Sequence, residues 1–222
     1  FEFQGQKCSA ASRAYVPRSI WNAIKDEFLA EVEGIKQGHA SDFSNFMTAV
    51  IDEKAFKRVS GAIDRAHADK SIDVVAGGTY DGSQGWFIRP TVLVGTDPTA
   101  EFFTDEYFGP VLAIYVYEDN NWRDTLAQME NVAKYALTGA IIAQDRDAIT
   151  EMSEALRFAA GNFYINDKPT GAVVGQQPFG GGRASGTNDK AGAAINLMRW
   201  TSDRSIKETM VPAQNYQYPF MG

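Results

Sequence analysis

The sequence has little cysteine and little histidine. Among its 222 residues there are one cysteine, Cys8, and two histidines, His39 and His67. One cysteine cannot form an internal disulfide or a zinc cluster, and neither histidine has a partner at metal-ligand or triad spacing. Disulfide scaffolds, zinc hydrolases and serine hydrolases are therefore excluded, no metal site is expected, and the cysteine count fits a reducing compartment.

Positive charge and long apolar runs are also scarce. The chain has 21 Lys and Arg against 28 Asp and Glu, a formal net charge of −7, whereas nucleic-acid binding requires clustered Lys and Arg. No stretch approaches the roughly 18 apolar residues of a membrane helix. We therefore expect neither a nucleic-acid nor a membrane partner. Hydrophobic residues make up 44% of the chain, so it can bury the core of a globular protein.

The apolar periodicity predicts alternating helices and strands. Helices are expected over residues 18–37, 52–70, 122–133 and 146–158, and strands over 1–4, 72–76, 86–88, 91–94, 111–117, 139–143 and 163–165. Such alternation is typical of a mainly parallel sheet covered by helices, so the expected class is α/β. Residues 167–188 form a Gly- and Pro-rich loop of about 20 residues, and loops of this length usually carry function.

Two phosphate-binding motifs are incomplete. Gly181 and Gly186 have the spacing of a Walker A motif, but Thr187 stands where the motif requires Lys. A Gly-x-Gly-x-x-Gly fingerprint starting at Gly182 meets Ser185 in its last position. Neither motif identifies a nucleotide-binding loop in this sequence.

The lone cysteine is the strongest candidate for chemistry. Cysteine is the best nucleophile among the side chains because part of it is thiolate near neutral pH, and a neighbouring cation such as Lys7 increases that part. A lone cysteine is nevertheless most often a small buried hydrophobic residue. The residue type alone leaves both interpretations of Cys8 open.

The residues around Cys8 resemble a known signature. Residues 1–8 fit Phe-x-x-x-Gly-Gln-x-Cys, which resembles the active-site cysteine motif of the aldehyde dehydrogenase superfamily. Residues 106–111, Glu-Tyr-Phe-Gly-Pro-Val, resemble the Glu-x-Phe-Gly-Pro segment of that family, and residues 85–91 resemble the strand leading to it. The resemblance implies an aldehyde-dehydrogenase-type catalytic domain that oxidises an aldehyde with NAD.

The long loop narrows the resemblance to one branch of this family. Residues 161–171, 175–181 and 183–190 are similar to the dehydrogenases of L-glutamate γ-semialdehyde, the Δ1-pyrroline-5-carboxylate dehydrogenases of proline catabolism. The resemblance implies a catalytic, thiol-bearing domain over residues 1–203 and an oligomerisation tail over 204–222. It also implies that an upstream half, with the general base, the oxyanion asparagine and most of the NAD-binding domain, lies outside this sequence.

The resemblance assigns three residues to catalysis and to the cofactor. Cys8 is the expected nucleophile, Glu106 accepts hydrogen bonds from the nicotinamide ribose hydroxyls, and Phe108 lies beside the nicotinamide. Outside this motif, Glu106 would be interpreted as a solvated loop acid and Phe108 as an ordinary core aromatic.

Four further residues are assigned to the substrate, a small aldehyde with an α-carboxylate. Gly171 and Ala172 belong to the loop that holds the carboxylate, where backbone N–H groups bind the anion and Gly171 permits close approach and unusual dihedral angles. Phe179 is expected to pack on the aliphatic part of the substrate, and Ser9 lines the pocket. Ala172 replaces a serine of some relatives, so one hydrogen bond to the carboxylate is lost.

Other functions stay open at this point. The chain could act on another aldehyde, or it could be a truncated, non-catalytic piece that acts only in subunit assembly. The aromatic tail, residues 216–220, would be an aggregation hazard if bare, so we expect a homo-oligomer in which a C-terminal strand joins a neighbouring subunit. The expected compartment is the cytoplasm, with the mitochondrial matrix as the alternative, because a targeting segment would lie upstream.

Overall fold

The computed structural model describes residues 1–173 and 175–222. Its secondary-structure elements are, in chain order, η1 (Glu2–Gly5), β1 (Arg13–Pro17), α1 (Arg18–Gly34), α2 (Glu53–Ala68), β2 (Ile72–Ala76), β3 (Tyr80–Asp81), β4 (Phe87–Ile88), β5 (Thr91–Gly95), α3 (Glu101–Thr104), β6 (Val111–Tyr117), η2 (Asp119–Asn121), α4 (Trp122–Val132), β7 (Tyr135–Ala136), β8 (Thr138–Ile141), α5 (Arg146–Ala155), β9 (Asn162–Ile165), β10 (Gly182–Arg183), α6 (Ala194–Leu197), η3 (Met198–Trp200) and η4 (Pro219–Met221).

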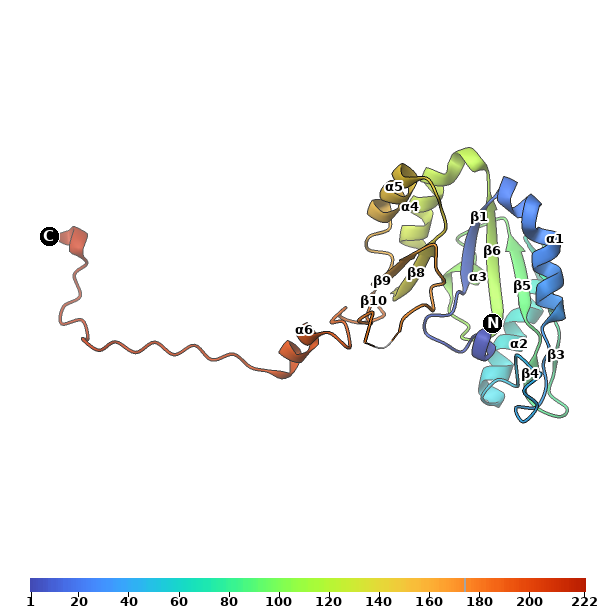
Figure 1. Ribbon diagram of the computed structural model, residues 1–222, viewed down its shortest axis with the longest axis horizontal. Coiled ribbons are helices and arrows are strands. Elements are labelled where there is room, and N and C mark those ends of the chain that lie inside the picture. The colour runs from blue at the N-terminus through green and yellow to red at the C-terminus, as the bar shows by residue number, and fades with distance from the viewer. Residues whose placement is uncertain (174) are drawn as a thin grey trace.

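A four-stranded sheet in the order β1–β6–β5–β2 forms the centre of the fold (Figure 1). Strands β1, β6 and β5 run parallel, and β2 is antiparallel to β5. These strands are rich in β-branched and aromatic residues, which favour a pleated and buried surface. The expected α/β class with a mostly parallel sheet is confirmed.

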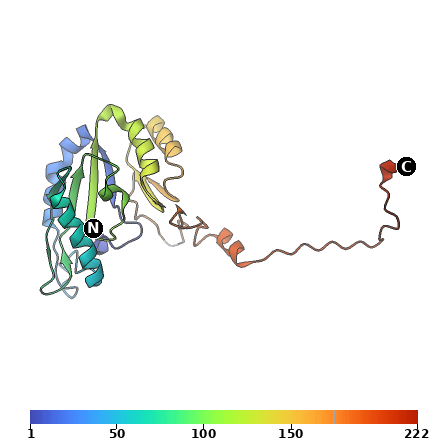
Figure 2. The ribbon, with the colours of Figure 1, turned by 180° about the vertical axis from the view of Figure 1, so that it is seen from behind.

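Helices cover both faces of this sheet, as the two opposite views show (Figures 1 and 2). On one face Trp21 of α1 packs with Val92 and Ile114 of the sheet. On the other face Val59 of α2 packs with Leu93, α3 and β6. Two separate apolar clusters therefore fix the position of the sheet between α1 and α2.

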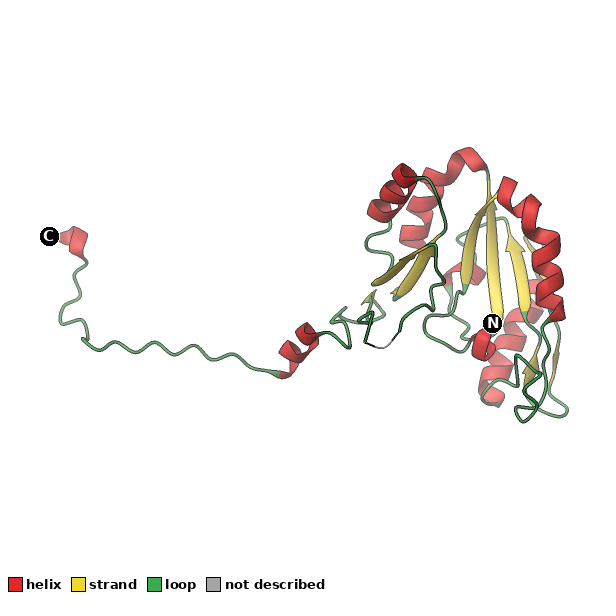
Figure 3. Cartoon of the chain, in the orientation of Figure 1, coloured by secondary structure: helices red, strands yellow, loops and turns green. Residues whose placement is uncertain are grey.

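A second unit consists of the parallel pair β8–β9 with α4 and α5 (Figure 3). Leu126, Ile141, Ile149 and Leu156 form its own buried cluster. The structure therefore contains two packed units, joined by the connection between β6 and α4.

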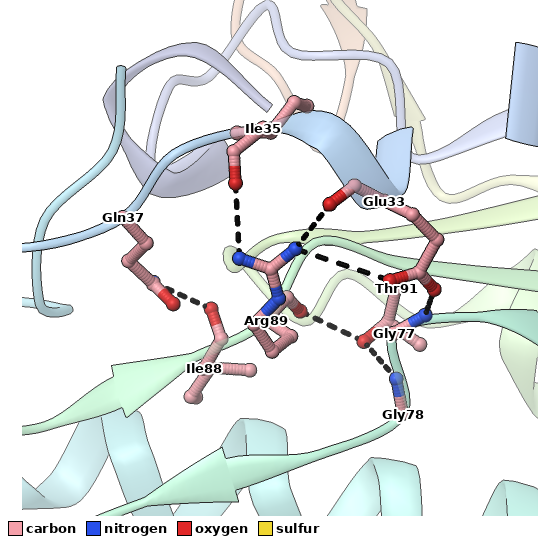
Figure 4. A network of polar contacts seen from close by, with 8 residues as sticks. All are labelled: Glu33, Ile35, Gln37, Gly77, Gly78, Ile88, Arg89 and Thr91. Carbon is pink, nitrogen blue, oxygen red and sulfur yellow. Dashed lines mark hydrogen bonds and ion pairs between the residues drawn. The ribbon is translucent and has the colours of Figure 1, made fainter. Parts of the chain in front are cut away.

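Arg89 ties the end of α1 to the central sheet (Figure 4). Its guanidinium donates from Nη1 to the carbonyl oxygen of Ile35 and from Nη2 to that of Glu33, each at 2.9 Å. The Glu33 carboxylate in turn accepts the N–H of Gly77 at 2.6 Å. Because α1 has no basic residue in its last turn, Arg89 supplies the charge that stabilises a helix C-terminus.

The predicted helices are largely confirmed, with two corrections for α1. The helix ends at Gly34 rather than at residue 37. Ile20 and Ile24, expected on its buried face, are 50% and 44% exposed. Asp52 is the N-cap of α2 as expected, because its Oδ1 accepts the N–H of Ala55 at 2.7 Å.

The expected strand over residues 1–4 is wrong. Phe3 and Gln4 have φ values of 55° and 59°, in the left-handed region that no strand contains. The amide Nε2 of Gln4 donates to the carbonyl oxygen of Ala49 at 2.9 Å. This contact with a distant segment overrides the local preference, and residues 2–5 form the short helix η1.

The predicted C-terminal strand is not found in this chain. Residues 201–218 are exposed and contain no helix or strand, and they lead away from both packed units (Figures 1 and 2). A single strand cannot satisfy its backbone hydrogen bonds without a neighbour. A strand formed against another subunit stays a prediction. Within residues 1–173 and 175–222, no helix combines the length and the apolarity that a membrane crossing requires.

Candidate active site

Cys8 lies in a turn between η1 and β1. The N–H of Ala10 donates to the carbonyl oxygen of Lys7 at 3.1 Å, which places Cys8 and Ser9 at the centre of the turn. The Cys8 side chain is exposed, so it is not the small buried hydrophobic residue that a lone cysteine usually is. The ammonium of Lys7 forms an ion pair with Glu2 at 2.9 Å, so its charge is shared with a carboxylate and does not act on the thiol alone.

The turn that carries Cys8 is anchored to the segment that carries Glu106. Gly5 has a φ of +66°, and a Cβ at this position would lie only 2.3 Å from the carbonyl oxygen of Gly109. Gly109 itself packs on α2, where a Cβ would lie 2.5 Å from Cγ2 of Val59. Glycine is required at position 5 because the two backbones touch, and at position 109 because the Val59 side chain fills the space of a Cβ. The two signature segments are therefore held together by direct packing.

Glu106 and Phe108 are linked to each other. One carboxylate oxygen of Glu106, Oε1, accepts the N–H of Phe108 at 3.0 Å. Withdrawal from water raises the pKa of the Glu106 carboxyl above its ordinary value, although the Phe108 hydrogen bond and the positive charge of Arg13 act in the opposite direction. Phe108 has a φ of 51° and is 38% exposed. The described residues supply no hydrogen bond to the second carboxylate oxygen, which is free to bind a ligand.

A cleft brings Cys8 and Glu106 together. It encloses about 640 Å³ between the two packed units, and its walls include β1, β8 and Pro169. Arg13, at the start of β1, lines the same cleft. The sequence analysis missed Arg13, although its position directly after the nucleophile segment was a usable signal.

A smaller cavity of about 350 Å³ shares Glu106 with the cleft. Three basic residues line it: Arg58, Arg65 and Lys134. Arg65 is paired with Glu101 at 2.9 Å, whereas Nε of Arg58 donates to a backbone carbonyl oxygen. Asp105 lines this cavity as well, 4.0 Å from the ammonium of Lys134. Glu106 therefore lies between the cleft and a smaller cavity of mixed charge.

The structure does not place the expected substrate residues on the wall of the cleft. Ser9, Gly171, Ala172 and Phe179 are absent from its lining, and Phe108 is absent as well. The expected unusual dihedral angle at Gly171 is wrong, since its φ is not positive. A Cβ at Gly171 would lie 2.8 Å from Oδ2 of Asp167, and the close approach of a substrate carboxylate to this glycine stays a prediction.

The loop expected to hold the carboxylate, residues 169–179, is called the anchor loop below, and contacts place both of its ends. Pro169 contacts the same cleft as Cys8, and at the other end the N–H and the carbonyl oxygen of Phe179 both pair with Ala191 at 2.8 Å. The N–H of Gly171 is engaged by the carbonyl oxygen of Lys168 at 3.0 Å, so it is not free to bind an anion. Position 174 of the predicted loop lies outside the described residues.

Comparison with known proteins decides the family. A sequence profile described as the aldehyde dehydrogenase family matches residues 1–206. The chain belongs to the aldehyde dehydrogenase family. Its cleft, with Cys8 and Glu106 on one wall, is thus a site in an aldehyde dehydrogenase fold.

Among the aldehyde dehydrogenases similar to this chain, the mitochondrial Delta-1-pyrroline-5-carboxylate dehydrogenase of Dictyostelium discoideum is 52% identical over 221 residues, covering 100% of this chain and 40% of the relative. The enzyme of the same name from Homo sapiens is 49% identical over 222 residues, covering 100% of this chain and 39% of its own length. The Delta-pyrroline-5-carboxylate dehydrogenase of Mycobacterium tuberculosis, solved with bound NAD, superposes with a TM-score of 0.84 at 52% identity, over 99% of this chain and 40% of that one. The chain therefore spans about 40% of the length of these relatives.

Proposed function

We propose that this chain is the thiol-bearing part of an NAD-dependent dehydrogenase that oxidises L-glutamate γ-semialdehyde to L-glutamate in proline catabolism. The observation that carries the proposal is the cleft that Cys8 and Glu106 line together. The names of the relatives support the same substrate. The catalytic, thiol-bearing domain is residues 1–203, and residues 204–222 form the oligomerisation tail.

The position of Cys8 suits attack on a carbonyl. The thiolate adds to the aldehyde carbon, and the bond between sulfur and carbon gives a hemithioacetal oxyanion. The described residues contain no acceptor for the backbone N–H of Cys8, so this N–H is free to stabilise the oxyanion. Loss of hydride from the same carbon leaves a thioester, and water hydrolyses it to the acid and regenerates the thiol. The base that activates the water belongs to the part of the enzyme outside this chain.

The surroundings of Glu106 fit a dinucleotide cofactor. The free oxygen of its carboxylate is a suitable acceptor for ribose hydroxyls, and the Phe108 hydrogen bond fixes the orientation of the carboxylate. Phe108 is exposed enough to contact a nicotinamide ring. Arg58, which forms no ion pair among the described residues, lines the smaller cavity beside Glu106 and suits the negative charge of a cofactor phosphate. When bound, NAD accepts the hydride.

The anchor loop is the proposed determinant of the substrate. Gly171 and Ala172 would bind the α-carboxylate, with Ser9 and Phe179 around the aliphatic part. Since these residues do not line the cleft in this chain, and the N–H of Gly171 is engaged by Lys168, we propose that the substrate pocket is completed by residues outside the chain and that the loop adjusts when the substrate binds.

The test of the nucleophile is Cys8→Ala in the complete enzyme, in which this chain is joined to the portion that its relatives also contain. NADH production from glutamate semialdehyde should fall to the background rate, because no other described side chain in the cleft is a thiol. Ser41→Ala is the control, since it makes a similarly small truncation at an exposed position outside the cleft and leaves the sulfur in place. Activity of the Cys8→Ala enzyme above background would refute the assignment.

Two other functions compete with this proposal. A dehydrogenase of another aldehyde would oxidise pentanal as well as glutamate semialdehyde, so the ratio of the two kcat/KM values separates the candidates. A non-catalytic assembly piece would show no activity even when joined to the remaining part of the enzyme. We propose that the isolated chain is inactive and that the joined chain is active.

The remaining proposals concern assembly and location. The exposed aromatic tail favours a homo-oligomer, and a strict monomer of the complete enzyme in sedimentation would contradict this. The relatives from Dictyostelium discoideum and Homo sapiens are named mitochondrial. We therefore favour the mitochondrial matrix over the cytoplasm that the sequence analysis placed first.

A further inference from the structure

Asn162 is a buried polar residue at the first position of β9, and its side chain contacts the backbone on both sides of Phe179. It is only 7% exposed. Its Nδ2 donates to the carbonyl oxygen of Pro178 at 3.0 Å, and its Oδ1 accepts the N–H of Gly180 at 3.1 Å. A carboxamide carries the same donor and acceptor as a peptide group, so Asn162 pairs with this segment as a neighbouring strand would.

Lys190 strengthens the same contact. Its ammonium donates to the carbonyl oxygen of Gly180 at 3.0 Å, to the carbonyl oxygen of Gly161, and to Oδ1 of Asn162 at 3.4 Å. In the described part of the chain, no carboxylate lies within ion-pair distance of Lys190. Withdrawal from water accordingly lowers the pKa of Lys190. The ammonium of Lys190 therefore bridges the backbone carbonyl groups of Gly161 and Gly180.

The backbone segments around Gly161 and Gly181 are in close contact with their neighbours. A Cβ on Gly161 would lie 2.1 Å from the carbonyl oxygen of Gly180, and a Cβ on Gly181 would lie 2.4 Å from that of Ala136. Phe179 itself is paired through both its N–H and its carbonyl oxygen with Ala191. The backbone of Phe179 is thus held from two sides, by Asn162 and by Ala191.

We propose that Asn162 is a positioning residue that sets the preference for an α-carboxylate substrate, by fixing the end of the anchor loop at Phe179. This inference rests on the proposed function. The loop begins at Pro169, beside the cleft that contains Cys8, and ends at Phe179. With the Phe179 end fixed, the residues that bind the carboxylate, Gly171 and Ala172, lose less conformational freedom when the substrate binds. Without the hydrogen bonds of Asn162, the loop conformation that binds the carboxylate is less populated. The apparent affinity for glutamate semialdehyde then falls in proportion.

The test compares two substrates in the complete enzyme. Asn162→Ala removes the two hydrogen bonds to the backbone of Pro178 and Gly180, together with the 3.4 Å contact from Lys190. It should raise KM for glutamate semialdehyde about tenfold. KM for pentanal, which has no carboxylate to bind but still contacts Phe179 through its aliphatic chain, should rise clearly less, by about threefold at most. Amide hydrogen exchange in the peptide over residues 178–181 should also become faster, while the peptide over 138–141 should keep its protection.

Asn166 offers a matched control at the other end of β9. Its carboxamide also makes two hydrogen bonds to backbone, donating to the carbonyl oxygen of Ala143 at 2.8 Å and accepting its N–H at 2.9 Å. Asn166→Ala removes the same number of bonds but leaves Phe179 held. It should lower the unfolding temperature and leave the ratio of the two KM values unchanged. If Asn166→Ala raised KM for glutamate semialdehyde more than KM for pentanal, as is expected of Asn162→Ala, the inference would be overturned.

Asn162→Asp serves as a second variant if the alanine enzyme does not fold. It keeps the acceptor for Gly180 and replaces the donor to Pro178, so KM for glutamate semialdehyde should rise about threefold. A wild-type KM in this variant, or equal losses for both substrates in Asn162→Ala, would overturn the inference. No preference for glutamate semialdehyde in the wild-type enzyme refutes the proposed function and this inference together. A wild-type preference that survives Asn162→Ala refutes the inference alone.

Discussion

Gly5→Ala is the substitution that tests most directly how the two signature segments are joined. Alanine at a φ of +66° is strained by roughly 1 to 2 kcal/mol. The added Cβ would also lie 2.3 Å from the carbonyl oxygen of Gly109, where real contacts essentially never fall below 3.0 Å. Because the opposing atom belongs to the backbone, the turn that carries Cys8 must move away from the segment that carries Glu106. The required shift is on the order of 1 Å, and such a misplacement can cost about 100-fold in rate.

The assay measures kcat/KM with glutamate semialdehyde in the complete enzyme, together with thermal unfolding. Gly5→Ala should lower kcat/KM about 100-fold, which corresponds to about 2.7 kcal/mol of transition-state stabilisation. Gly34→Ala is the control, because nothing lies within 4 Å of a Cβ added there and its φ is not positive. This control should keep kcat/KM within about twofold, and its unfolding temperature should equal or slightly exceed that of the wild type.

Two results would refute the reasoning. Wild-type kcat/KM in Gly5→Ala would show that contact between the two backbones does not set the position of Cys8. Equal losses in Gly5→Ala and Gly34→Ala would show that any added methyl group is harmful, whatever its surroundings. Unfolding data alone do not decide the question, since the strain at a positive φ affects stability even where the site is undisturbed.

Three further substitutions test charge and capping. Glu106→Gln should be more stable than the wild type at pH 7, because the folded site holds the carboxyl pKa above its ordinary value of 4.5, and a raised pKa means that stability is lost as pH rises. In thermal unfolding this advantage should grow above pH 4.5 and then level off, while affinity for NAD falls about tenfold; an advantage independent of pH would contradict this. Asp52→Ala should lower the free energy of unfolding by about 1 kcal/mol in urea, because the N–H of Ala55 loses its acceptor. Arg89→Met should lower it by about 2 kcal/mol, because the last carbonyl groups of α1 lose their donors. A loss below about 0.5 kcal/mol in either variant would show that water replaces the missing partner.

Local patterns predicted most of the regular elements. Strand β6 matches its expected range of 111–117, and α2 begins after the expected cap Asp52. Both are determined by neighbours in the sequence: a dense run of β-branched and aromatic residues in one case, and an N-cap followed by apolar residues at helical spacing in the other. The strand expected over residues 1–4 was wrong because the side chain of Gln4 bonds to Ala49, a contact between segments more than 40 residues apart.

The sequence by itself determined the α/β class, the order of most helices and strands, and the residues proposed for the chemistry, with Cys8 first among them. The class and the order of elements follow from residue type and short-range spacing, which act before the chain is compact, whereas the residues proposed for the chemistry follow from the resemblance of residues 1–8 and 106–111 to the aldehyde dehydrogenases. Only the tertiary structure decided that Gly5 touches Gly109, that Arg13 lines the same cleft as Glu106, and that Asn162 holds the backbone on both sides of Phe179. Such contacts join residues that are not neighbours in the sequence, and they exist only after the elements of each packed unit have come together.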